Sequence, residues 1–182
     1  MRKRELKMLF KTKPWEHQIK ALEYLYPRDT AALYTDMGTG KSKIMIDLIA
    51  NREWQTVLIV CTKKGCQNWV KQFKYHYPAE YTIKNLTDLS SVDKVAALKT
   101  AVRKHTGKLI IVVNYDSIWR DPFCNELLKK YVKIDCIICD ESHRIKTPGS
   151  KCSRYLTKIG KKVKCRYLVT GTPLAENPVD II

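Results

Sequence analysis

The amino-acid sequence predicts an α/β domain with a predominantly parallel sheet and helices on both faces. Two patterns predict this class. Short apolar runs, such as 56–61 and 109–113, alternate with longer segments whose apolar residues recur every three or four positions. Strands that are apolar throughout are typical of a sheet buried on both faces, and a helix between successive strands favours parallel pairing. We therefore expect a single domain over residues 1–182.

The expected elements follow in order from the N-terminus. Residues 1–13 form a basic lead-in, either an arm or an edge strand, and Pro14 opens a helix that Pro27 closes. Strands are expected at 31–35, 56–61, 81–85, 109–113, 136–139 and 166–169. Further helices are expected at 40–53, 65–76, 92–105, 121–131 and 150–162. In such a sheet, ligands bind beyond the carboxyl ends of the strands.

The chain is strongly basic. It has 34 Lys and Arg against 18 Asp and Glu, a formal charge of +16. Such an excess favours a polyanionic partner, first of all nucleic acid, with a solvated basic surface as the alternative. A membrane partner is disfavoured because no segment joins an apolar face to a long basic face, and no apolar run has membrane-spanning length.

The cysteines indicate an intracellular protein. Seven cysteines form no evenly numbered, closely spaced framework, which favours reduced thiols. Cys136 and Cys139 have a metal-like spacing, but they lie three apart in an expected strand, where they would point to opposite faces. Buried core thiols are the better interpretation.

A glycine-rich loop joins the first strand to the next helix. Residues 34–42 read Tyr-Thr-Asp-Met-Gly-Thr-Gly-Lys-Ser. In a phosphate-binding loop Lys41 would reach the β- and γ-phosphates, and Ser42 would offer its hydroxyl to Mg²⁺. The backbone N–H groups that would cradle phosphate oxygens begin with those of Gly38, Thr39 and Gly40. Because the usual pattern has glycine where Thr35 stands, an ordinary glycine turn is the alternative at this point.

A pair of carboxylates directly follows the strand expected at 136–139. Asp140 would hold Mg²⁺ through water, and Glu141 would orient and deprotonate the attacking water. An acidic structural turn is the alternative, which the upstream phosphate loop disfavours.

Two other polar side chains have candidate roles. The amide of Gln18 could read the N6/N7 edge of adenine, or Gln18 could simply face solvent. His143 could relay the state of the γ-phosphate to Thr170 and Thr172, or it could be a hydrogen-bonded structural histidine.

The last quarter of the chain carries a basic run. Residues 144–166 contain nine Lys and Arg, Lys146 and Lys151 among them, and no acid. This favours contacts to nucleic-acid phosphates, with a solvated helix face as the alternative. The aromatic candidates for base stacking, with core packing as the alternative, are Trp69, Tyr115 and Trp119.

Taken together, these segments resemble the first RecA-like lobe of superfamily-two helicases, and most closely the Swi/Snf-like DNA translocases. That family's loop, Asp-Glu-Met-Gly-Leu-Gly-Lys-Thr, also lacks the first glycine, so residues 35–42 look like a variant of it. The likeness covers roughly residues 14–178. The segments that carry it are Gln18, 38–42, Thr62-Lys63 with Trp69, 114–116, 140–143 and 170–173.

The resemblance implies a RecA-like P-loop domain that binds ATP and Mg²⁺ and couples ATP hydrolysis to movement on duplex DNA. It implies Gln18 on adenine, Lys41 on phosphates, Ser42 and Asp140 on Mg²⁺, Glu141 as catalytic base, and Thr170 and Thr172 in coupling. The segments expected at the tracked DNA strand contain Lys63, Trp69, Asn114 and Tyr115.

The resemblance also implies a partner lobe. In that family a second RecA-like lobe bears the arginine finger, so we expect this chain to be a fragment that binds ATP and hydrolyses it slowly. We expect it in the cytoplasm of a bacterial or viral host cell rather than in a nucleus.

Three other functions stay open. One is a strand-separating DNA or RNA helicase or the motor of a restriction system, since unwinding depends on elements outside this lobe. Another is a P-loop kinase for small molecules, which would not need the basic run. The last is a nucleic-acid-binding module without ATP turnover.

Overall fold

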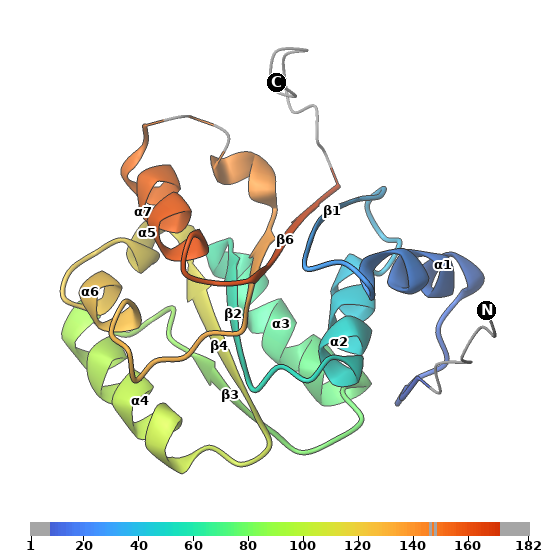
Figure 1. Ribbon diagram of the computed structural model, residues 1–182, viewed down its shortest axis with the longest axis horizontal. Coiled ribbons are helices and arrows are strands. Elements are labelled where there is room, and N and C mark those ends of the chain that lie inside the picture. Colours follow the sequence, from blue (N-terminus) through green and yellow to red (C-terminus); the bar gives the residue numbers. More distant parts are fainter. Residues whose placement is uncertain (1–7, 146, 148, 172–182) are drawn as a thin grey trace.

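The computed structural model describes residues 8–145, 147 and 149–171. These residues form an open sheet of six strands, all parallel, in the order β1-β6-β5-β2-β4-β3 (Figure 1). The strands are β1 (Thr30–Tyr34), β2 (Thr56–Cys61), β3 (Tyr81–Asn85), β4 (Lys108–Asn114), β5 (Cys136–Asp140) and β6 (Cys165–Thr170). The predicted parallel α/β sheet is confirmed.

Helices cover both faces of the sheet. One core layer lies under α1 (Glu16–Leu25), α2 (Lys41–Asn51) and α3 (Lys63–His76). The opposite layer lies under α4 (Ser91–Lys104), α5 (Tyr115–Ile118), α6 (Phe123–Leu127) and α7 (Lys151–Gly160). A short 3₁₀ turn, η1 (Ser142–Ile145), follows β5. Because apolar helices lie above and below it, β2 is buried along its whole length, as its unbroken apolar sequence predicts.

Two predicted elements differ from the structure. The helix expected at 121–131 is present but shorter, as α6, which begins after Pro122 at its N-cap, and the short α5 was not predicted. The described part of the lead-in, 8–13, is neither a free arm nor a strand. It lies against α2 and α3, where Asn51 Nδ2 donates to Leu9 O at 3.0 Å and Lys11 Nζ to Lys74 O at 2.8 Å.

All seven cysteines are free. Cys136 and Cys139 belong to the two opposite core layers, which confirms that this pair faces apart. Within the described ranges, no three His, Cys, Asp or Glu side chains gather as a metal-binding group. No helix in that part of the chain combines the length and apolarity that crossing a bilayer requires.

Asp29 links the start of β1 to two basic side chains. Its Oδ1 accepts from Arg52 Nη2 at 2.7 Å and its Oδ2 pairs with Lys164 Nζ at 2.8 Å, which lowers the pKa of Asp29 from 3.8 to about 2. A carboxyl whose folded pKa is depressed stabilises the fold above its unfolded pKa and loses that contribution as the pH falls through about 2.

We therefore expect Asp29→Asn to lower the urea midpoint at pH 7, with the difference from the parent chain closing as the pH falls from 3.8 toward about 2. Urea unfolding followed by circular dichroism at several pH values measures this. The exposed Glu80→Gln is the matched control and should leave the midpoint at pH 7 unchanged. A deficit of Asp29→Asn that is constant across this pH range would contradict the ion-pair explanation.

Candidate nucleotide site and basic groove

Three neighbouring strands end side by side at the edge of the sheet where the polar residues gather. Tyr34 of β1 lies opposite Thr170 of β6, and Asp140 of β5 lies opposite Val169 of β6. Since β6 separates β1 from β5, Thr170 lies between the glycine-rich loop that follows Tyr34 and the carboxylates that begin at Asp140.

The loop after β1 is curled around the amine of Lys41. Lys41 Nζ donates to Thr35 O at 2.9 Å and to Asp36 O at 2.8 Å. Gly38 and Gly40 have φ of +80° and +81°, a region that favours glycine. A Cβ at Gly40 would also lie 2.3 Å from Gln18 Nε2, so a side chain there would displace the Gln18 amide from Thr39 as well as strain the backbone. The loop therefore holds a lysine amine at the N-terminus of α2, where the helix dipole also favours an anion.

A cleft of about 380 Å³ joins this loop to the carboxylates. One wall consists of the loop and the start of α2, through Met37, Gly38, Gly40, Lys41 and Ser42. The facing residues are Asp140 and Glu141. The structure thus brings together the predicted phosphate-binding lysine, the predicted magnesium ligands and the predicted base in one cavity. Thr39 takes part through its carbonyl, which accepts from Gln18 Nε2 at 3.1 Å.

Asp140 is held by hydrogen bonds from two sides. Trp69 Nε1 donates to Asp140 Oδ2 at 2.8 Å, and Tyr115 Oη donates to the backbone carbonyl of Asp140 at 2.7 Å. Burial raises the pKa of the Asp140 carboxyl, while the Trp69 bond and the charge of Lys41 act in the opposite direction. Burial raises the pKa of Tyr115 well above its usual range, so its hydroxyl stays a donor.

Glu141 has an unusual backbone conformation, with φ of +53°. For a residue other than glycine this costs about 1–2 kcal/mol. Glu141 N donates to Asp140 Oδ1 at 3.0 Å. Strain of this kind is concentrated at functional sites.

The predicted coupling residues that the structure describes are in contact. Glu141 Oε2 lies 3.4 Å from His143 Nδ1 and 3.4 Å from Thr170 Oγ1, and His143 Nδ1 lies 3.2 Å from Thr170 Oγ1. A Cβ on Gly171 would lie 3.1 Å from Lys41 Nζ, so the end of β6 touches both sides of the cleft. Thr172 lies outside the described residues.

Gln18 is 4% exposed, so the solvent-facing alternative is wrong. Its Oε1 accepts from Trp15 N at 3.0 Å and its Nε2 donates to Thr39 O. This amide closes the first turn of α1 and ties that turn to the loop. Because the amide has a second N–H and a second lone pair, its assignment to adenine stays a prediction. The sequence does contain a signal for this capping role, because a Gln three residues after the N-cap residue of a helix commonly accepts from the backbone N–H of that N-cap residue.

A second hollow, of about 560 Å³, lies beside the first and shares Thr62 with it. We call it the basic groove. Lys151 Nζ lies 5.2 Å from the Trp119 ring at its rim, and Lys63 at its edge pairs with Asp88 at 3.3 Å. Its lining residues are Thr62, Lys63, Lys64, Tyr115, Asp116, Trp119, Arg144, Ser150 and Cys152.

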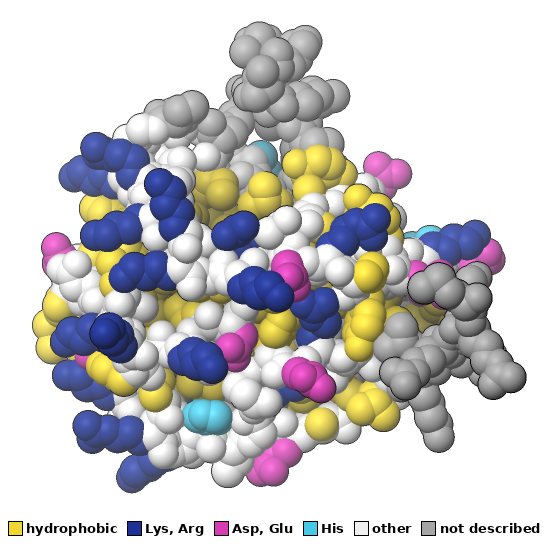
Figure 2. Space-filling view, in the orientation of Figure 1, with side chains coloured by type: hydrophobic (Ala, Val, Ile, Leu, Met, Phe, Trp, Pro, Cys, Tyr) yellow, Lys and Arg dark blue, Asp and Glu magenta, His cyan; other side chains and the backbone are white. Residues whose placement is uncertain are grey.

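Basic side chains extend beyond the groove. Figure 2 shows Lys and Arg gathered over the side of the molecule that carries α4, α6 and α7. Lys151, Arg154, Lys158, Lys161 and Lys162 are exposed there. Of the basic run, Arg144 lines the groove and Lys151 lies at its rim, whereas Lys146 lies outside the described residues.

Three residues predicted to touch nucleic acid are buried. Trp69 is 0% exposed, which favours the core alternative for its ring, and Asn114 and Tyr115 are each 6% exposed, although Tyr115 still lines the groove. Trp69 belongs to the buried face of α3 with Cys66 and Phe73, a helical spacing that marks core positions. Asn114 Oδ1 accepts from Ser117 Oγ at 2.5 Å at the start of α5. Trp119 is the half-buried aromatic that lines the groove.

Sequence reasoning missed residues that line the nucleotide cleft from α3. These are Gly65, Asn68 and Gln72. Asn68 and Gln72 lie four apart and so share a helix face, but polar residues at this spacing are ordinary on any solvated helix. Only the packing of α3 against β2 and α2 shows that this face borders the cleft.

The donor atoms fit a magnesium nucleotide. Ser42 and Asp140 supply a hydroxyl and a carboxylate to the same cleft, and Mg²⁺ prefers one or two such oxygen ligands together with substrate phosphates. Lys41 supplies the positive charge for those phosphates. The residues in the cleft therefore fit a complex of ATP with Mg²⁺ better than they fit a metal site made of protein ligands alone.

Comparison with known proteins agrees with this architecture. Two solved DNA-bound restriction-modification enzymes of Type ISP share the fold: LlaGI, with a TM-score of 0.62 at 19% identity, and LlaBIII, with a TM-score of 0.65 at 18% identity. Each alignment covers 89% of this chain, but 18% and 13% of the respective enzyme. At this identity the likeness shows the RecA-like helicase fold alone.

Sequence relatives extend the comparison. The chain is 28% identical over 173 residues to a Caenorhabditis elegans SWI/SNF-related regulator of chromatin, covering 90% of the chain and 17% of the relative. It is 27% identical over 179 residues to the Danio rerio DNA excision repair protein ERCC-6-like, covering 91% and 12%. The chain thus spans less than a fifth of the length of these relatives. Residues 17–182 match the model of the SNF2-related domain, and the chain belongs to that family.

Proposed function

We propose that the chain is the ATP-binding motor lobe of a DNA-dependent ATPase that moves along duplex DNA when joined to a second RecA-like lobe. One observation carries this proposal: Lys41 and Ser42 face Asp140 and Glu141 across a single cleft, and a lysine-lined groove adjoins that cleft. Membership of the SNF2-related family supports it. So do the relatives, whose names describe chromatin regulation, DNA repair and helicase activity.

Each wall of the cleft has its own task in this mechanism. Lys41 and the backbone of the glycine loop hold the phosphates, while Ser42 and Asp140 hold Mg²⁺. Bound Mg²⁺ supplies neutralisation of the charge that develops on the phosphate oxygens. Glu141 orients the attacking water and takes its proton, since its carboxylate opens into the same cleft.

Thr170 is suited to report the state of the nucleotide to the rest of the lobe. It ends β6, it lies within 3.4 Å of the Glu141 carboxylate, and the next residue approaches Lys41. We assign the same task to Thr172. A shift of this segment on ATP binding and hydrolysis would change how the two lobes meet, and repeated closure and reopening would move the protein along DNA.

The basic groove is the proposed contact for the DNA backbone. Lys63 and Lys64 line it, Lys151 lies at its rim, and Lys146 is assigned to the same surface by the sequence. Such contacts release counterions, so the affinity for DNA should fall steeply as the salt concentration rises. In a plot of the logarithm of the affinity against the logarithm of the salt concentration, each phosphate contact should contribute about −0.9 to the slope. Contacts of this kind carry little sequence information.

Full activity requires the partner lobe. An arginine finger stabilises transition-state charge and is worth roughly 10³- to 10⁵-fold in rate, so the chain by itself should bind ATP and hydrolyse it slowly. The free thiols support an intracellular protein, and we propose the cytoplasm of a bacterial or viral host cell.

The deciding experiment measures ATP hydrolysis in a longer chain that carries both lobes, with no nucleic acid, with duplex DNA and with RNA. We expect duplex DNA to raise the rate. A rise with RNA alone would instead indicate a helicase of another branch. Equal rates in all three conditions would favour a small-molecule kinase or a module without turnover, and would overturn the proposal.

A further inference from the structure

We propose that Trp69 and Tyr115 are positioning residues that couple occupancy of the basic groove to the geometry of Asp140 and Glu141. The inference rests on the proposed function, because it takes the groove as the DNA contact and the two carboxylates as the magnesium and water site. It assigns a task to two aromatic side chains that are almost entirely buried.

Both donors hold the same residue, but at different atoms. The indole of Trp69 fixes the carboxylate of Asp140 through Oδ2, at 2.8 Å. The hydroxyl of Tyr115 fixes the backbone carbonyl of Asp140, at 2.7 Å. Trp69 is 0% exposed and Tyr115 is 6% exposed, so water does not readily replace either bond. Orientation of Asp140 therefore depends on the positions of α3 and α5, which carry these donors.

The Tyr115 bond also determines the orientation of Glu141. The carbonyl of Asp140 and the N–H of Glu141 belong to one peptide group, and that N–H donates to Asp140 Oδ1 at 3.0 Å. The peptide is thus held at both of its polar atoms. Because the next backbone angle is the strained φ of +53° at Glu141, rotation of this peptide redirects the Glu141 side chain. One small movement would change the magnesium ligand and the base together.

Each donor also lies on an element that begins at the groove. The helix α3 starts at Lys63, and Lys63 and Lys64 line the groove; Trp69 follows on the same helix, about 8–9 Å further along its axis. The short helix α5 starts at Tyr115, and Asp116 lines the groove beside it. A polyanion that draws these lysines toward itself therefore pulls on α3, and its charge repels Asp116 at the start of α5, so both elements that hold Asp140 respond to the groove.

The packing allows a shift to reach the cleft. Trp69 lies against Phe73, with ring centroids 6.2 Å apart, inside the core layer formed by α1, α2 and α3. Close-packed interiors transmit displacement because they contain few voids to absorb it. The contacts of Trp69 and Tyr115 join α3 and α5 to Asp140. They are distinct from the contacts of His143 and Thr170, which lie at the end of β6.

The test measures the affinity of the chain for a fluorescent, slowly hydrolysed ATP analogue with Mg²⁺, in the absence and in the presence of a saturating DNA duplex. The ratio of the two affinities is the coupling factor, which we expect to be about 5- to 150-fold in the parent chain. Trp69→Phe combined with Tyr115→Phe removes both donors and keeps the rings. We expect its coupling factor to fall to within about twofold of 1.

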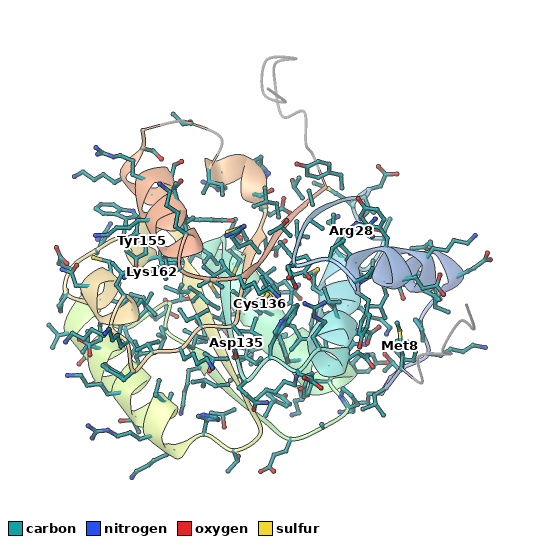
Figure 3. All side chains as sticks on the ribbon, viewed as in Figure 1. Met8, Arg28, Asp135, Cys136, Tyr155 and Lys162 are labelled. Atoms are coloured by element: carbon teal, nitrogen blue, oxygen red, sulfur yellow. The ribbon has the colours of Figure 1, made fainter. Side chains whose placement is uncertain are left out.

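Tyr155→Phe is the matched control. The hydroxyl of Tyr155, on α7 (Figure 3), also donates to a buried backbone carbonyl at 2.7 Å, but that carbonyl belongs to Cys124 of α6 rather than to Asp140. This variant should keep the coupling factor of the parent chain. Tyr115→Phe alone leaves the packing of Trp69 intact and serves as a second test if the double variant folds poorly. It should lower the logarithm of the coupling factor to half of the parent value or less.

The outcomes separate the inference from the proposed function. If the parent chain binds nucleotide and duplex and the variants keep its coupling factor, the inference is overturned and the motor lobe stands. If the parent chain binds both ligands without mutual effect, the inference is overturned as well. If the parent chain binds neither ligand, the proposed function falls first, and the inference falls with it.

Discussion

Replacing Glu141 with glutamine is expected to lower the rate of ATP hydrolysis at least about 100-fold in a chain that carries both lobes, because general base catalysis typically contributes 10²- to 10⁴-fold. Glutamine keeps the shape of the side chain but cannot take a proton from water. ATP affinity should stay within about threefold, since Glu141 is assigned to the water rather than to the phosphates. Steady-state hydrolysis and equilibrium nucleotide binding measure the two quantities separately.

The matched control for this variant is Glu80→Gln, which makes the same chemical change at an exposed site. It should leave both the rate and the affinity unchanged. Hydrolysis that continues at the parent rate in Glu141→Gln would remove the catalytic assignment and favour a module that binds nucleic acid without turnover.

Replacing Lys41 with alanine is expected to weaken binding of ATP with Mg²⁺ about 100-fold in the present chain. Its amine donates to two loop carbonyls, at 2.9 Å and 2.8 Å, in the cradle where phosphate oxygens would take their place. Each charge-assisted hydrogen bond is worth about 1.5–3 kcal/mol, so loss of the lysine removes a major part of the phosphate attraction. Isothermal titration calorimetry measures the affinity directly, and thermal unfolding shows whether the variant is folded.

Lys64→Ala is the control for Lys41→Ala, because it removes the same charge from the basic groove instead of the cleft. It should leave ATP affinity unchanged. It should also make the slope of the logarithm of DNA affinity against the logarithm of salt concentration shallower, by up to about 0.9. Unchanged ATP affinity in Lys41→Ala would mean that the loop after β1 is not a phosphate site, and the motor interpretation would be lost.

Much of the fold was predictable because it depends on neighbouring residues. The run 56–61 is apolar at nearly every position and folds as the fully buried β2. The loop at 34–42 has glycines at the two positions whose φ is positive, so its turn chemistry is visible in the sequence. The helix expected at 121–131 was predicted too long, because it begins only after Pro122 and ends at Leu127.

The candidate site was predictable only in part. Lys41, Ser42, Asp140 and Glu141 follow strands directly, so an edge shared by parallel strands brings them together. The sequence did not show that the Trp69 ring is fully buried, because an aromatic residue near a basic segment suits either a stacking surface or a core. It also did not show that Gln18 closes the first turn of α1, since an amide can serve a helix terminus as well as a base.

The sequence by itself determined the alternation of strands and helices, the phosphate loop and the strand-end carboxylates, because each is a property of contiguous residues. Only the tertiary structure decided the strand order, in which β6 brings Thr170 between the loop and Glu141. It also decided that Trp69 and Tyr115 hold Asp140. These contacts join residues far apart in the chain, and burial depends on which elements pack together rather than on any local pattern.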